Sequence, residues 1–130
     1  LLGELAADPL DTDTADGRPF TPDWSRARLA RMLLEDPEKF SMADAVALAE
    51  HCAAAQARDV ARALRRVAAA LPGPAAAVVL SGHGACLVRR ALGRVGWRVP
   101  VVSLAERLSP AVARVAPAHA LALVALGELR

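Results

Sequence analysis

The spacing of apolar residues changes along the chain and predicts three segments of different structure. Residues 1–20 are dense in turn formers and lack a periodic apolar pattern, which predicts an irregular segment. Residues 21–71 repeat apolar side chains at intervals of three and four, the period of a helix. Residues 72–130 alternate short apolar runs with glycine and proline turns, which predicts a βαβ unit and a terminal helix. We expect the three segments to form one domain.

Two helices are predicted in the middle segment. Thr21 would cap the first helix with Pro22 at its first position, and Asp36 before Pro37 would end it. Its expected apolar face consists of Leu29, Met32 and Leu33.

The second helix should extend from Ser41 to Leu71. Ser41 and Asp44 have the spacing of a capping box, with Asp in place of the usual Glu. Spacings of three, four and seven predict one buried stripe: Val46, Ala53, Ala57, Val60, Leu64, Val67 and Leu71. Arg62 would then lie on the solvated side, and the helix would pack on the sheet of the third segment.

The pattern changes after Pro72-Gly73-Pro74. The continuous apolar run 75–80 is typical of a buried parallel strand, and 85–92 reads as a helix. A second strand is expected over 99–102, so the fold class is α/β, helix-rich with a short parallel βαβ unit. Pro110 and Pro117 then divide the remainder into a short helix or turn and a last helix from Ala118 to about Leu129.

Composition excludes several classes of protein. With 55% hydrophobic residues in 130, the chain is not disordered, and a net charge of +2 gives no basis for binding nucleic acid. Lys39 is the only lysine among 16 basic residues, an excess of arginine that we ascribe to GC-rich codons. The longest apolar run, 116–127, falls short of the roughly 20 residues of a membrane-spanning helix, so we expect no membrane partner.

Cysteine usage points to the cytoplasm. Cys52 and Cys86 form neither a disulfide scaffold nor a C-x-x-C pair. We therefore expect two buried thiols in a reducing compartment. The first ten residues carry no basic residue of the kind that begins a signal peptide.

The turn Ser81-Gly82-His83-Gly84 is the segment with candidate chemistry. A strand that ends in a glycine turn and opens a helix presents backbone N–H groups at the positive end of the helix dipole, where phosphate can bind. Gly82 and Gly84 permit positive φ and leave room for a ligand against the backbone. The alternative, a tight turn with a structural role only, stays open.

Other chemistries fit the sequence poorly. The turn lacks the third glycine of a dinucleotide fingerprint and the G-K-[ST] of a Walker A loop. Ser81 is not inside the G-x-S-x-G motif that marks the nucleophilic serine of a hydrolase. The catalytic residues are therefore unknown. His51, His83 and His119 have no zinc-ligand spacing with the cysteines, and we assign no metal site. His119 is expected to be half-buried.

Four blocks of sequence, taken in order, carry a resemblance to a known family. They are D-T-A-D-G-R-P at 13–19, V-V-L-S-G-H-G-A-C-L-V-R-R-A-L at 78–92, V-P-V-V-S-L-A-E-R-L-S at 99–109 and A-R-V-A-P-A-H-A-L-A-L-V-A at 113–125. The chain resembles the hydantoinase/oxoprolinase-like proteins linked to tetrahydromethanopterin-dependent one-carbon transfer, whose archaeal relatives act in methanofuran biosynthesis. These proteins belong to the sugar kinase, actin and heat-shock chaperone superfamily.

The resemblance implies the C-terminal part of an actin- or sugar-kinase-like ATPase lobe in a longer, two-lobed protein. It implies that Ser81, Gly82, His83 and Gly84 bind a nucleotide, with ATP and Mg²⁺ as cofactors of the full-length enzyme. The phosphate loops of the superfamily are missing here and would lie before Leu1, so this part alone is expected to be inactive.

The partner implied by the resemblance is a nucleotide or a small-molecule phosphate substrate, and assembly into a homo-oligomer stays open. Two alternatives to the enzyme remain. One is a non-catalytic scaffold or regulatory module with the ATP-binding fold, and the other is an unrelated α/β interaction domain.

Overall fold

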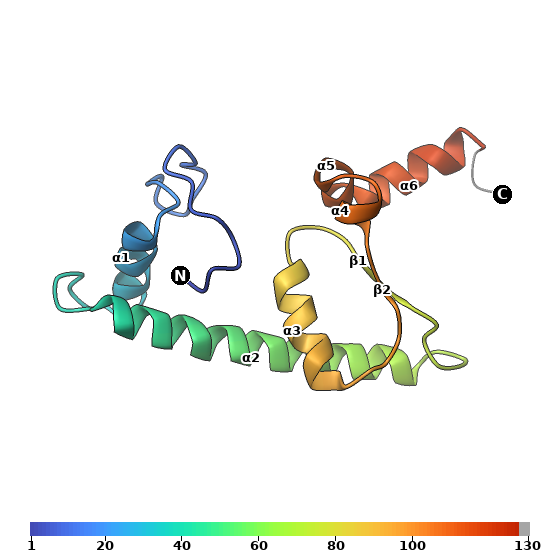
Figure 1. The fold of residues 1–130 in the computed structure, drawn as a ribbon, viewed down its shortest axis with the longest axis horizontal. Coiled ribbons are helices and arrows are strands. Elements are labelled where there is room, and N and C mark those ends of the chain that lie inside the picture. The colour runs from blue at the N-terminus through green and yellow to red at the C-terminus, as the bar shows by residue number, and fades with distance from the viewer. Residues whose placement is uncertain (128–130) are drawn as a thin grey trace. The chain divides into compact units, whose positions relative to one another are not determined.

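The chain is a helix-rich α/β protein in the computed structural model, which describes residues 1–127. Its elements in chain order are α1 (Pro22–Met32), α2 (Met42–Ala69), β1 (Val78–Leu80), α3 (Ala85–Val95), β2 (Val101–Ser103), α4 (Leu104–Arg107), α5 (Pro110–Arg114) and α6 (Ala116–Ala125) (Figure 1). The predicted fold class is thus confirmed at the level of a mixed α/β chain with a short parallel sheet. The last helix was expected from Ala118 to about Leu129, a residue outside the described ones, but α6 begins two residues earlier, at Ala116, and already ends at Ala125.

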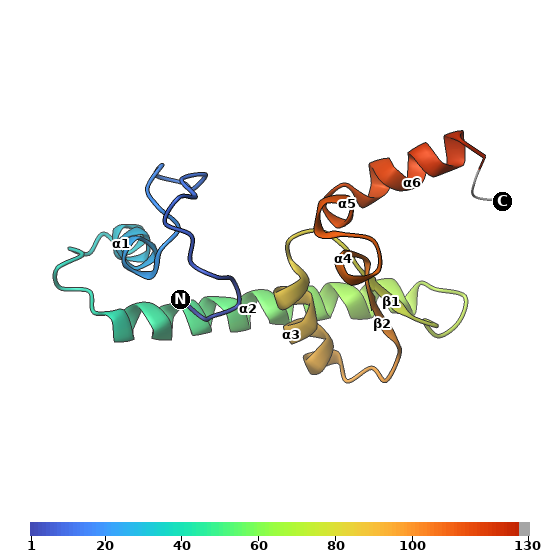
Figure 2. The same cartoon turned by 45° about the horizontal axis from the view of Figure 1, so that its top comes forward.

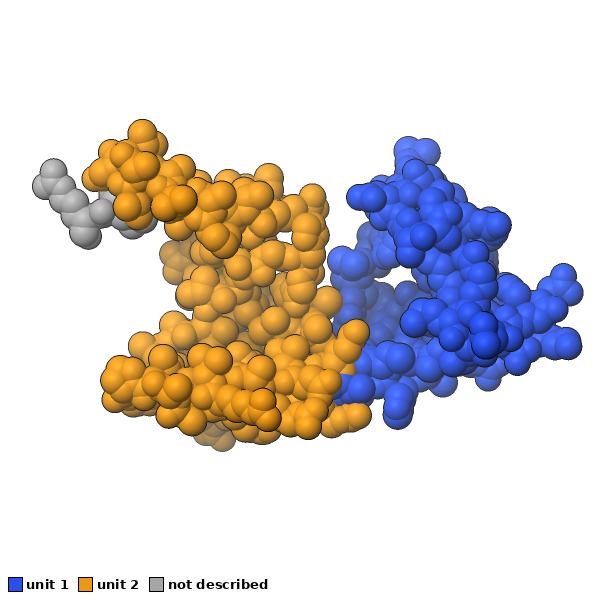
Figure 3. Space-filling model, turned by 180° about the vertical axis from the view of Figure 1, so that it is seen from behind, with its two compact units in different colours: residues 1–55 blue, residues 56–130 orange. Residues whose placement is uncertain are grey.

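The chain divides into two compact units (Figure 3). Unit 1 comprises residues 1–55 and unit 2 begins at Gln56, so the boundary falls within the continuous helix α2. It stays a prediction that the sequence consists of three segments, 1–20, 21–71 and 72–130, which form one domain.

The first segment of unit 1 is irregular, as predicted, and is tied down at two places. An isolated antiparallel bridge joins Asp8 to Phe20, whose carbonyl oxygen accepts the Asp8 amide at 2.9 Å. The carboxylate of Asp16 forms ion pairs with Arg28 and Arg31 of α1. These contacts compensate for the lack of regular secondary structure before Thr21.

Helix α1 begins as predicted but buries a different face. Thr21 is the N-cap residue and Pro22 follows at the first position, whereas the helix already ends at Met32. Leu29 of the expected face is partly buried and packs against the core, whereas Met32 and Leu33 are exposed and the fully buried positions are Ala27 and Ala30. The correction has a steric reason: the small Ala30 allows the buried Phe40 and Ala45 to pack closely in the core of unit 1.

The predicted capping box of α2 is confirmed. The hydroxyl of Ser41 accepts the amide of Asp44 at 3.1 Å, and the carboxylate of Asp44 accepts the amide of Ser41 at 3.1 Å. The hydrogen bonds from the hydroxyl and the amide of Ser41 hold the pKa of Asp44 below its usual value. Two donors at the start of the helix are thereby satisfied.

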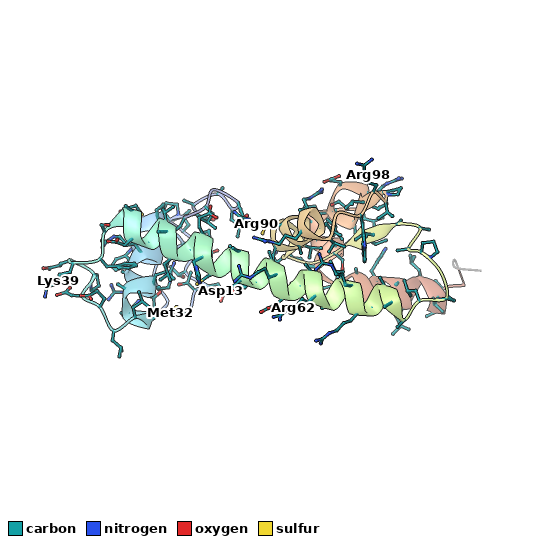
Figure 4. The ribbon with its side chains drawn as sticks, turned by 90° about the horizontal axis from the view of Figure 1, so that it is seen from below. Asp13, Met32, Lys39, Arg62, Arg90 and Arg98 are labelled. Carbon is teal, nitrogen blue, oxygen red and sulfur yellow. The ribbon has the colours of Figure 1, made fainter. Side chains whose placement is uncertain are left out.

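The buried stripe of α2 was correct in the middle and wrong at its end. Of the predicted stripe, Ala57 is buried and Leu64 is half-buried, but Val67 is 62% exposed and the exposed Leu71 lies beyond the helix. Ala61 is also buried, although it was not part of the predicted stripe. Arg62 is exposed, as predicted, and pairs with Asp59 on the same helix (Figure 4). Because alanine dominates this helix, small side chains rather than the large ones mark its buried face.

Unit 2 contains the predicted parallel pair of strands. Val78 lies opposite Val101 and Leu80 opposite Ser103, and the views of Figures 1 and 2 agree in placing β1 beside β2. Both strands are shorter than the apolar runs that predicted them, because residues 75–77 and 99–100 are outside the ladder. Helix α3 connects the two strands and completes the βαβ unit.

The short helix α4 follows directly from β2 and contacts both β1 and β2. The expected packing of the long helix α2 on the sheet stays a prediction. The hydroxyls of Ser103 and Ser109 cap α4 and α5, accepting the amides of Glu106 and Val112. The break predicted at Pro110 thus starts a five-residue helix, and α6 has Pro117 in its first turn.

Two further expectations have mixed outcomes. The thiols are not buried as expected: Cys52 is exposed on α2 and Cys86 is half-buried. His119 is half-buried, as predicted. Within residues 1–127 no helix has both the length and the apolar character needed to cross a bilayer.

Candidate functional site

The turn formed by residues 81–84 lies where the sequence places it, between the end of β1 and the start of α3. Ser81, His83 and Gly84 are exposed, and Gly82 is partly buried. Because β1 and β2 are parallel, this turn lies at the carboxyl edge of the sheet. Ligands of open α/β sheets bind at that edge.

Gly82 is needed for its conformation. Its φ is +79°, in the left-handed region that residues with a Cβ atom avoid. Its amide donates to the carbonyl oxygen of Ala113 at 2.8 Å, so a backbone hydrogen bond joins the turn to α5. This amide is therefore not free for a ligand, which corrects the expectation that the whole turn offers unused N–H groups.

The start of α3 remains open. Gly84 is the N-cap residue and has no side chain, so no side chain caps the helix. The first intrahelical donor is Val88, whose amide reaches the carbonyl oxygen of Gly84 at 3.1 Å. The amides of Ala85, Cys86 and Leu87 come before it and have no acceptor in the helix. A Cβ atom added at Gly82 or Gly84 would meet nothing within 4 Å, so the space over these glycines is open.

Two polar contacts hold α3 in unit 2. The guanidinium of Arg89 pairs with Glu106 of α4 at 3.1 Å, on the turn after the helix start. The guanidinium of Arg65 on α2 donates to the carbonyl oxygen of Arg94 at 2.8 Å, near the last turn of α3. Both contacts are exposed, and an exposed ion pair such as Arg89–Glu106 contributes little energy, about 0–1 kcal/mol.

Ala113 is the site residue that the sequence analysis missed. It lies in the five-residue α5 and only 2% of its surface is exposed. Its role is performed by a backbone carbonyl, which every residue type carries, so the side-chain pattern offers no signal for it. Pro110 indicated the local break and not the contact to Gly82.

A small hollow lies at the other end of the sheet. Its volume is about 180 Å³, and its lining residues precede the strands: Ala68, Pro74, Ala75, Trp97, Arg98 and Val99. This hollow belongs to the amino edge of β1 and β2, so it is separate from the turn at the carboxyl edge.

The charge around the turn suits an anion better than a metal ion. No acidic residue occurs between Asp59 and Glu106, and Glu106 is engaged by Arg89. In the described part of the chain, no three His, Cys, Asp or Glu side chains come close enough to hold a metal ion. Comparisons with family models, with curated proteins and with solved structures gave no match.

Proposed function

We propose that residues 81–84 and the first turn of α3 bind the phosphate of a nucleotide, ATP in the first instance. The observation that carries the proposal is the uncapped start of α3 beneath open space at the carboxyl edge of a parallel pair. The amides of Ala85, Cys86 and Leu87 would donate to phosphate oxygens, and the helix dipole would favour the negative charge.

The order of the four sequence blocks at 13–19, 78–92, 99–109 and 113–125 supports a more specific hypothesis for the same site. On this reading the chain is the C-terminal part of a hydantoinase/oxoprolinase-like protein with an actin- or sugar-kinase-like ATPase lobe. The whole protein would be an ATP-dependent enzyme of methanofuran-type coenzyme biosynthesis in tetrahydromethanopterin-linked one-carbon metabolism, working in the cytoplasm. Residues 81–84 would position the phosphate chain, which is the principal protein contribution in phosphoryl transfer.

The residues at the turn fit a phosphate group and do not fit Mg²⁺. The hydroxyl of Ser81 is the one side-chain oxygen that the turn supplies, and magnesium sites in proteins ordinarily use carboxylates. The proposal therefore rests on the backbone amides, and Mg²⁺ would be held by the phosphates of the nucleotide or by residues outside 81–87.

A second candidate is an interaction module whose turn has no ligand. The hydrogen bond from Gly82 to Ala113 and the positive φ of Gly82 already explain one of the two glycines by folding alone. Gly84 separates the two candidates, because its φ of −88° is open to any residue and so gives no folding reason for glycine.

Amide chemical shifts of the chain test the phosphate site directly. Titration with inorganic phosphate or ATP should move the amide signals of Gly84, Ala85, Cys86 and Leu87, and adenosine, which has no phosphate, should not. Gly84→Leu should remove the response, since its side chain would cover the first turn of α3. The matched control is Gly93→Leu, in the same helix with equally open space around it.

Two results would contradict the phosphate site: unmoved amides in the folded chain, or an unchanged response in Gly84→Leu. The first result would favour the interaction module. The enzyme part of the proposal is tested separately on the full gene product, where Gly84→Leu should abolish ATP consumption and Gly93→Leu should preserve it.

A further inference from the structure

An ion pair joins Arg89 of α3 to Glu106 of α4, next to the helix start that we propose to bind phosphate. The guanidinium and the carboxylate are 3.1 Å apart, and the two side chains are 52% and 73% exposed. In the described part of unit 2, Glu106 and Asp59 are the two acidic residues. The charge of Glu106 therefore bears directly on how an anion is held in this unit.

The register of the sheet brings Glu106 to the same edge as the turn. Leu80 lies opposite Ser103 in the parallel pair, so the turn at 81–84 and the helix α4 leave the sheet at the same level. Helix α4 contacts β1 as well as β2, and Figures 1 and 2 agree in placing it beside the start of α3 and away from its end. The hydroxyl of the buried Ser103 accepts the amide of Glu106 at 3.4 Å, which fixes the backbone that carries the carboxylate.

Arg89 lies where its guanidinium can reach an anion at the start of α3. It follows Ala85, Cys86 and Leu87 by two to four positions, which is about 3–6 Å along the axis at about 1.5 Å per residue. Side chains of a helix lean toward its amino end, and residues three or four positions apart share a face. The guanidinium of Arg89 can therefore turn from Glu106 to a phosphate bound to the amides of Ala85 and Cys86.

The pair is weak enough to be exchanged in this way. An exposed ion pair contributes little, because water screens both charges and two long side chains must be held in one geometry. A phosphate oxygen would accept a charge-assisted hydrogen bond from Arg89, and the amides of α3 would hold the same anion in place. The planar guanidinium matches phosphate as well as it matches a carboxylate.

We propose that Glu106 competes with phosphate for the guanidinium of Arg89, so that this ion pair sets the affinity of the site. Glu106 holds Arg89 when no phosphate is bound. When phosphate binds, Arg89 leaves Glu106 and becomes the charged side chain that contacts the anion. The inference rests on the phosphate site proposed above and adds its regulation: loss of the Glu106 charge strengthens binding, and loss of Arg89 weakens it.

Dissociation constants for inorganic phosphate test the proposal. They are measured from the amide signals of Gly84 and Ala85 in the whole chain, at low ionic strength where charge effects are largest. Glu106→Gln removes the competitor and should tighten binding about two- to fivefold. Arg89→Gln removes the charged donor and should weaken binding about fivefold or more. Circular dichroism establishes that each variant is folded.

The chain offers a matched control in the ion pair between Asp59 and Arg62. Both residues belong to α2 in unit 2, and their side chains are 66% and 68% exposed. Asp59→Asn and Arg62→Gln change the net charge by the same amounts as the two test variants. They should leave the dissociation constant nearly unchanged, because neither residue contributes a group to the proposed site. Equal effects of Asp59→Asn and Glu106→Gln would reduce the result to net charge and overturn the proposal.

The double variant separates competition from direct repulsion. If Glu106 acts through Arg89, Glu106→Gln should strengthen binding much less in the Arg89→Gln background, where no guanidinium is left to release. An equal gain in both backgrounds would mean that Glu106 only repels the phosphate. That result would overturn the competition.

The carboxyl carbon signals of the unmodified chain give a measurement that needs no variant and stands even if Glu106→Gln does not fold. Phosphate should shift the signal of Glu106, which loses its partner, and should leave that of Asp59 in place. Suppose that phosphate moves the amides of α3, but neither the Glu106 signal nor the affinity of Glu106→Gln changes. The inference is then overturned and the phosphate site stands. Amides unmoved in both the unmodified chain and folded Glu106→Gln would overturn the two together.

Discussion

The amide of Gly82 donates a 2.8 Å hydrogen bond to the carbonyl oxygen of Ala113, which joins the candidate site to α5. The bond spans the whole of α3, β2 and α4 in the sequence. The conformation of the turn therefore depends on the packing of α5, whose Ala113 is buried.

Enlarging Ala113 should disturb both stability and the turn. We expect Ala113→Leu to lower the free energy of unfolding by about 1–3 kcal/mol, because added methylene groups must displace packed neighbours. The amide signal of Gly82 should shift at the same time. The control Ala111→Leu is exposed on the same helix and should stay within about 0.5 kcal/mol in a urea titration. Equal effects of the two variants would show that Ala113 has no tight packing.

Replacing the N-cap residue of α2 should lower the free energy of unfolding, whereas replacing the N-cap residue of α1 should leave it nearly unchanged. Ser41→Ala loses the hydrogen bond to the amide of Asp44 and should cost about 0.5–2 kcal/mol. Thr21 occupies the N-cap position of α1, but its side chain makes no cap hydrogen bond. Thr21→Ala should therefore change the unfolding free energy by less than about 0.5 kcal/mol. A reversed order in thermal unfolding would contradict this assignment of the caps.

These two caps show what local sequence can predict. Ser41 with Asp44, and Thr21 before Pro22, are patterns whose physics lies within one helical turn, and both helix starts were placed correctly. The strand β1 and the turn after it were found for the same reason, because an apolar run and two glycines are local signals.

What the sequence could not predict depends on contacts between distant segments. Periodicity shows which residues share a face of α1, but the burial of Ala30 is decided by Phe40 and Ala45. In the candidate site, the amide of Gly82 is occupied by a carbonyl from α5, which no side-chain pattern encodes. Residue types locate the turn, and only the fold shows which of its amides are free.

The ion pairs of Asp16 should make unit 1 sensitive to acid. Partial burial raises the pKa of Asp16, but the hydrogen bonds from Arg28 and Arg31 outweigh it and hold the pKa well below its usual value. A lowered folded pKa gives stability that is complete above the unfolded pKa of about 3.9 and is lost as the pH falls toward the folded value.

The variant Asp16→Asn tests this dependence. Its midpoint of unfolding should be lower than that of the unmodified chain at pH 7, and the difference should shrink as the pH falls below about 4. Trp24, which stacks with Arg18, reports on this region by fluorescence once Trp97 is replaced by Phe. Asp13 forms no ion pair with any other residue of 1–127, so the control Asp13→Asn should show no such dependence. A pH-independent difference for Asp16→Asn would mean that the contribution is not electrostatic.

Two alanine substitutions on α2, one at Leu64 and one at Val67, should distinguish its buried face from its exposed face. Leu64 is half-buried, so Leu64→Ala should cost about 1–2 kcal/mol, less than the 2–5 kcal/mol of a fully buried leucine. Val67 is exposed three residues further on, and Val67→Ala should change stability by less than about 0.5 kcal/mol. Denaturant titration of both variants measures the difference. Similar losses of unfolding free energy in the two variants would instead support the buried stripe that the sequence pattern predicted.

Three glycine-to-alanine substitutions in unit 2 should show whether backbone conformation or steric room determines the change in the free energy of unfolding. Gly82 and Gly96 have φ of +79° and +74°, and Gly84 has φ of −88°. A Cβ atom at any of the three would meet nothing within 4 Å, so the sign of the effect depends on φ alone. Gly82→Ala and Gly96→Ala should each cost about 1–2 kcal/mol, because the left-handed conformation brings Cβ against the following carbonyl oxygen. Gly84→Ala should be neutral or stabilise the chain by about 0.4–1 kcal/mol, since alanine restricts the unfolded chain and causes no strain in the folded one.

If Gly84→Ala destabilises the chain as much as Gly82→Ala in urea titrations, a folding requirement explains both glycines. In that case Gly84 no longer distinguishes a phosphate site from a structural turn, and the interaction module becomes the better account of unit 2.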